Sequence, residues 1–118
     1  MSEIRVELAP DFKGESVVLL AMDGDGLDVF SAVVAQLLQA GRGVLQLEHA
    51  GVTHVFNIED GADFEFTEKH VDWRFSSPKF TEVLEKLDAM KDSSGPCHHY
   101  VDISGPVETL VLSRDEYV

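Results

Sequence analysis

The middle of this chain contains four consecutive strand-like segments, and they restrict its fold more than any other feature. Residues 44–75 form short runs of alternating apolar and polar residues, separated by short turns. Neighbouring strands joined by such turns pair in antiparallel fashion. One helical pattern precedes this segment and another follows it, and each is flanked by two further strand patterns. The sequence therefore predicts an α+β fold in the order ββαββββαββ: two layers, with two helices on one face of a mainly antiparallel sheet.

The two helices are marked by residues that favour helix ends. The first is expected to begin near Asp25 or Gly26, with Asp25 as the N-cap, and to be ended by Gly41 and Gly43. The second should begin at the Ser77-Pro78 pair, because serine caps a helix well and proline suits the first helical position.

The apolar residues of both helices and of the strands point to one common core. Residues 17–22 are apolar throughout, which predicts a central strand covered on both faces. Both helical patterns carry a single apolar stripe, which is expected to face the sheet. The predicted core contains Trp73, Phe56, Phe64, Phe66, Phe30, Leu37, Phe80, Leu84 and Leu87.

The turn at residues 49–52 sets the register of a hairpin. If His49 pairs with Val52, then Leu47 faces His54, and the apolar and polar residues separate onto opposite faces. This separation supports the register.

The turn at residues 60–62 allows two registers. A two-residue Asp-Gly turn would pair Ile58 with Asp63 and place Phe64 on the polar side. A three-residue loop with a bulge pairs Ile58 with Phe64 and also keeps Phe66 in the core. We therefore predict the three-residue loop.

The charge of the chain excludes several classes of partner. The 118 residues include 22 acidic and 9 basic ones, for a formal net charge of −13. Such a charge opposes binding to nucleic acid or to an anionic membrane. Cys97 is the only cysteine, which fits a reducing compartment, and no signal peptide is visible in the first residues. We expect a cytoplasmic protein with a single domain over residues 1–118 and no internal repeat.

The acidic residues are concentrated in the segment of four strands. The predicted registers place Glu48, Glu59, Glu65 and Asp72 on the same outer face of the sheet. Such a face serves either solubility or the docking of a basic protein partner. The candidate partner-binding residues are Glu48, Glu59, Asp63, Glu65, Glu68 and Asp72.

The five histidines and the single cysteine raise the question of a metal site or a nucleophile. His49 and His54 share the apolar face of the hairpin, and a third zinc ligand would have to come from residues 97–99. We expect both histidines to be structural, with at least one more than half buried and bonded to backbone or to a carboxylate. No metal and no cofactor is predicted. The alternative is a small enzyme, or a metal- or ligand-binding domain, that uses His49, His54 and the Cys97–His99 segment.

The segment from Asp23 to Leu27 resembles the first motif of haloacid dehalogenase-like phosphatases, in which an aspartate attacks phosphorus. The partner lysine and the downstream acidic pair of that family are not visible at a plausible spacing. A calcium loop of the EF-hand type also fails, because Leu27 and Val34 stand where oxygen ligands are required. We therefore predict a glycine-rich turn that ends in an N-cap aspartate, and no catalytic residue.

Several segments together are similar to small acidic bacterial proteins that are predicted to be immunity proteins of polymorphic toxin systems. The similar segments are residues 4–8, the strand and helix around residues 23–27, the histidine-containing hairpin, and above all residues 98–103 and 107–113. The resemblance implies a cytoplasmic, non-enzymatic protein that binds and blocks a toxin, often a basic nuclease. It carries no catalytic residues over to this chain, and it leaves a homo-oligomer or a self-associating accessory domain open.

Overall fold

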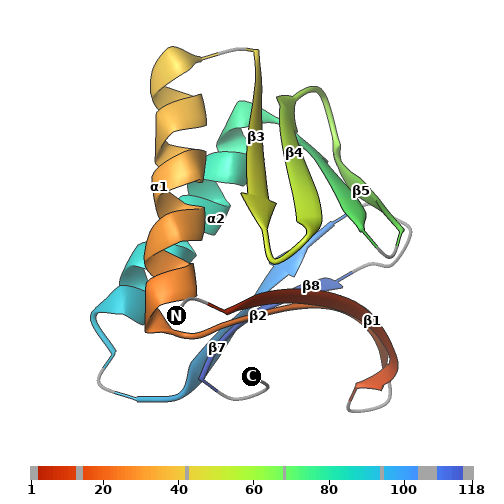
Figure 1. The fold of residues 1–118 in the computed structure, drawn as a ribbon, viewed down its shortest axis with the longest axis vertical. Helices are drawn as coiled ribbons and strands as arrows, with labels where there is room; N and C mark the ends of the chain where they lie inside the picture. Colours follow the sequence, from red (N-terminus) through yellow and green to blue (C-terminus); the bar gives the residue numbers. More distant parts are fainter. Residues whose placement is uncertain are drawn as a thin grey trace.

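The computed structural model describes residues 3–12, 15–41, 43–67, 69–93, 95–103 and 109–115. It contains two helices and eight strands in the predicted order, which confirms the α+β class (Figure 1). Neither described helix is long and apolar enough to cross a membrane. The elements are β1 (Ile4–Phe12), β2 (Glu15–Met22), α1 (Gly24–Ala40), β3 (Val44–His49), β4 (Val52–Ile58), β5 (Ala62–Thr67), β6 (His70–Phe75), α2 (Ser77–Lys91), β7 (Cys97–Asp102) and β8 (Thr109–Arg114).

The strands form two mixed sheets where the sequence predicted one mainly antiparallel sheet. Sheet A has the order β1-β2-β8-β7, and sheet B has the order β3-β4-β6-β5. In each sheet the two outer pairs are antiparallel and the central pair is parallel. Figure 1 shows α1 and α2 side by side along sheet B, with sheet A passing across their ends.

The topology divides the chain into two ββαββ halves with equivalent pairings, although no repeat is visible in the sequence. The first half runs from β1 to β4 and the second from β5 to β8. The first hairpin of each half joins the second hairpin of the other half through a parallel pair, β2 with β8 and β6 with β4. Each half therefore supplies one hairpin to each sheet, and this exchange produces the parallel pairs.

The predicted pairing of Ile58 with Phe64 is wrong, because β4 pairs with β6 and not with β5. Ile58 lies opposite Phe75, and Phe64 lies opposite Trp73. Strand β6 buries every inward-facing residue, whereas Phe66 on β5 is only partly buried. The strand with more apolar surface to bury takes the central position, and the less apolar strand forms the edge.

Both helices begin one or two residues before the predicted positions. The N-cap of α1 is Asp23, not Asp25, and the N-cap of α2 is Ser76, not Ser77. Gly41 ends α1 as predicted, with φ of 78° and its N–H donating to the carbonyl of Leu37.

One hydrophobic core fills the space between the helices and the two sheets. Phe66 and Leu84 are partly buried against it, and the other predicted core residues are buried within it. Residues 17–22 of β2 are buried on both faces, as their continuous apolar pattern predicted. The buried members predicted from sequence are Phe30, Leu37, Phe56, Phe64, Trp73, Phe80 and Leu87.

Candidate functional site

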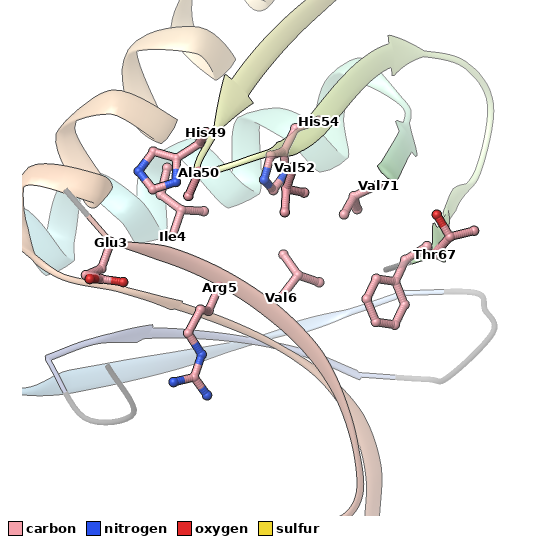
Figure 2. A pocket seen from close by; sticks show the side chains of 11 residues that line it. Glu3, Ile4, Arg5, Val6, His49, Ala50, Val52, His54, Thr67 and Val71 are labelled. Atoms are coloured by element: carbon pink, nitrogen blue, oxygen red, sulfur yellow. The ribbon is translucent and has the colours of Figure 1, made fainter. Parts of the chain in front are cut away.

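A cavity of about 290 Å³ lies where the β3–β4 turn and the end of β5 meet the first residues of β1 (Figure 2). The alternation of β1 aims Ile4 and Val6 toward the cavity, whereas Figure 2 shows Glu3 and Arg5 turned away from it. The walls are therefore mainly apolar. The side chains that face the cavity are the apolar Ile4, Val6, Val52, Phe66 and Val71 and the polar His49 and His54. Thr67 also lines the cavity, although alternation places its side chain on the outer face of β5.

His54 is the buried polar group of this cavity. Its side chain is 1 % exposed, and its Nδ1 accepts a hydrogen bond of 3.2 Å from Nε1 of Trp73. The two rings are nearly parallel, and the ring of Phe30 meets His54 edge-on. The pKa of His54 is lowered to about 4, mainly by burial and also by charge repulsion from the nearby His49 and His70. His54 is therefore neutral at neutral pH.

The hairpin register that places both histidines on one face is confirmed. His49 pairs with Val52, and Leu47 pairs with His54. His54 also confirms the expectation that at least one histidine is more than half buried. Its hydrogen-bond donor is the Trp73 indole, however, and not the backbone or carboxylate group that we expected. The sequence did not predict this partner, because Trp73 is distant from His54 in the chain and comes close to it only through the pairing of β4 with β6.

The structure does not bring the Cys97–His99 segment to the two histidines of the cavity. These residues lie on β7, the edge strand of sheet A, and pair with residues of β8. Cys97 is partly buried against the core. Within the described ranges, no group of three His, Cys, Asp or Glu side chains is arranged to hold a metal ion.

The outer face of sheet B gathers most of the predicted partner-binding residues. The registers align Asp72 with Glu65, and Glu48 lies on the same face at the β3 edge. Asp63 lies on this face as well, whereas Glu59 is exposed just beyond the end of β4. Glu68 lies outside the described residues. We call Glu48, Asp63, Glu65 and Asp72 the acidic face.

Arg74 is the cation that partly balances the acidic face. Its Nε donates to Asp63 at 2.8 Å, and its Nη2 donates to Glu65 at 3.1 Å. These hydrogen bonds raise the pKa of Arg74, so the guanidinium stays charged. His70 lies 3.0 Å from a carboxylate oxygen of Asp72. The alternation of β6 predicts that His70, Asp72 and Arg74 point outward, but only the tertiary pairing shows which carboxylates Arg74 joins.

A half-buried valine lies in the middle of the acidic face. Val55 on β4 is flanked by Gln46 on one side and by Asp72 on the other. Val55 is therefore an apolar centre surrounded by polar and acidic side chains on this face.

The glycine-rich segment after Asp23 is the first turn of α1 and not the predicted turn before an N-cap at Asp25, and Asp23 forms a structural junction there. Oδ1 of Asp23 accepts from the backbone N–H of Gly26 at 2.7 Å and of Glu3 at 2.9 Å. Burial opposes ionisation, but these hydrogen bonds outweigh it and lower the pKa of Asp23. The carboxylate thus holds β1 to the start of α1. Nearby, Nη1 of Arg114 donates to the carbonyl of Met90 at 2.8 Å and caps α2.

Comparison of the chain with protein-family models, curated proteins and solved structures finds no match. The cavity and the acidic face are therefore interpreted from their own geometry and charge.

Proposed function

We propose that this chain is a non-enzymatic binding protein of the cytoplasm that neutralises a basic protein, as toxin-immunity proteins do. The observation that carries the proposal is the acidic face, where the two parallel-paired hairpins of sheet B bring carboxylates from three strands onto one surface.

The acidic face retains excess negative charge after its internal ion pairs are counted. Arg74 bonds to both Asp63 and Glu65, so one guanidinium serves two carboxylates. Glu65 lies directly opposite Asp72, a like-charged pair that costs stability unless something else favours it. The net charge of −13 extends this field over the whole molecule. A cationic partner surface would relieve the repulsion and be attracted at long range.

The apolar centre and the acidic rim suggest different roles in binding. Charges at a rim mainly set the association rate and its dependence on salt, whereas desolvated apolar contacts set the lifetime of a complex. We expect Glu48 and Asp72 to steer a basic partner, and Val55 to contact it after docking.

The test uses a purified basic protein encoded next to the gene for this chain. Association rates are measured for the double variant Glu48→Lys/Asp72→Lys at roughly 0.05 M and about 0.5 M salt, where screening lengths differ severalfold. The variant should associate at least about tenfold more slowly at low salt, and the difference should shrink strongly at high salt.

The matched control is Asp28→Lys/Glu85→Lys, which makes the same change in charge at exposed positions on the two helices. Its association rate should stay within about twofold of the original chain. An equal slowing of both double variants would contradict the acidic face as the docking surface. Absence of binding to every basic neighbour would contradict the proposed function itself.

A further inference from the structure

We propose that the cavity between β1 and the β3–β4 turn binds a small, uncharged and mainly apolar molecule through a hydrogen bond from Nε2 of His54. The ligand would carry one acceptor, such as a carbonyl oxygen, on an aromatic or aliphatic body. This site is separate from the proposed docking of a basic protein.

The size and walls of the cavity favour such a ligand over water. Its volume of about 290 Å³ is near the lower end of small-molecule sites. A water molecule occupies about 30 Å³, so several waters would fit, but the aliphatic and aromatic walls offer them few partners. Replacing poorly bonded water with an apolar group favours binding.

The hydrogen bond from Trp73 fixes the role of His54. Because Nδ1 accepts from the indole N–H, the proton of the neutral imidazole lies on Nε2. Among the described residues, none accepts a hydrogen bond from Nε2. His54 lines the cavity, so an acceptor on a bound molecule could receive a hydrogen bond from this N–H, and such a bond would stabilise the complex.

The charges near the cavity exclude a strongly ionic ligand. Arg5 turns away from the cavity, and its guanidinium pairs with Glu7 at 3.4 Å. Glu3 also points outward (Figure 2). The buried imidazole of His54 is neutral, so a carboxylate or phosphate placed against it would lose its hydration without a fixed counter-charge.

The cavity and the acidic face lie on opposite sides of sheet B. His54 points inward, whereas its chain neighbours Thr53 and Val55 belong to the outer face, as strand alternation requires. Failure of one proposal therefore leaves the other standing.

The experiment titrates the full chain with acetophenone and with α-methylstyrene, which has nearly the same shape but no acceptor oxygen. Trp73 is the only tryptophan, so its indole N–H gives a single resonance in a ¹H–¹⁵N spectrum. Acetophenone should shift this resonance, because an acceptor on Nε2 polarises the imidazole that receives the indole proton. It should also bind about three- to tenfold more tightly than α-methylstyrene.

Two phenylalanine variants on β1 test the location. Val6→Phe places a ring into the cavity and should abolish the shift, whereas Leu8→Phe, on the same strand but 47 % exposed and outside the cavity walls, should leave it unchanged. Equal affinity of the two probes, loss of the shift in Leu8→Phe, or no binding of acetophenone would each overturn the proposal.

Discussion

At the level of single residues, the pair of His54 and Trp73 shows how a polar group is accommodated in the core. The indole donates to Nδ1, and the aromatic rings of Phe30 and Phe56 pack around the imidazole. Protonation of His54 would place a charge in this apolar setting and remove the acceptor of the indole N–H. The neutral histidine is therefore part of the folded state.

This arrangement predicts that the fold weakens in mild acid. The pKa of His54 is about 4 in the folded chain against an ordinary 6.5, so the unfolded chain binds the proton more tightly. The stabilisation is complete above pH 6.5 and is lost as the pH falls toward 4. Between pH 7 and pH 5 the free energy of unfolding should drop by about 2 kcal/mol. Urea denaturation at both pH values measures the difference.

The control for this prediction is His54→Gln, which removes the titrating group but keeps a polar side chain. Its free energy of unfolding should change much less between pH 7 and pH 5. A loss in the variant equal to that of the original chain would assign the acid sensitivity to other groups.

At the level of elements, the contact between β1 and α1 depends on an absent side chain. The backbone of Glu3 passes so close to Gly26 that an added Cβ would lie 1.9 Å from the Glu3 carbonyl oxygen. The same two segments are joined by the carboxylate of Asp23. Gly26 is therefore required by close packing and not by a special backbone conformation.

Gly26→Ala should destabilise the fold by about 3 kcal/mol or more, because backbone must move to admit the methyl group. Gly24→Ala is the matched control, two residues earlier in the same helix. Its Cβ would meet only the end of the flexible Arg114 side chain, at 3.2 Å. The control should be neutral or slightly stabilising, since alanine favours helices. Thermal unfolding measures the stability of both variants. Similar melting temperatures would contradict the close approach of the Glu3 backbone to Gly26.

At the level of the whole molecule, the exchange of hairpins makes the two halves depend on each other. Each sheet contains one hairpin from each half. Within each sheet, a central parallel pair of strands joins the two hairpins. A half alone would expose the apolar faces of both of its hairpins and the edges of its central strands. A two-stranded hairpin is only marginally stable by itself.

Separate fragments of residues 1–60 and 61–118 should therefore be largely unfolded, and an equimolar mixture should regain the fold. Dispersed amide resonances that appear only on mixing would confirm this interdependence. A fragment of residues 1–60 that unfolds cooperatively by itself as a monomer would show that the halves are independent.

The sequence by itself determined the local features of this protein. Alternation and turn residues set the β3–β4 register, and apolar stripes set the two helices and most of the core, because these patterns act between near neighbours. The carboxylates of the acidic face and the inward position of His54 follow from the same alternation. Only the tertiary structure decided that β4 joins β6, that the strands form two sheets, and that Trp73 bonds to His54. The strand pairing depends on which of several distant strands buries the most apolar surface at the centre of a sheet. A local sequence pattern cannot compare distant strands in this way.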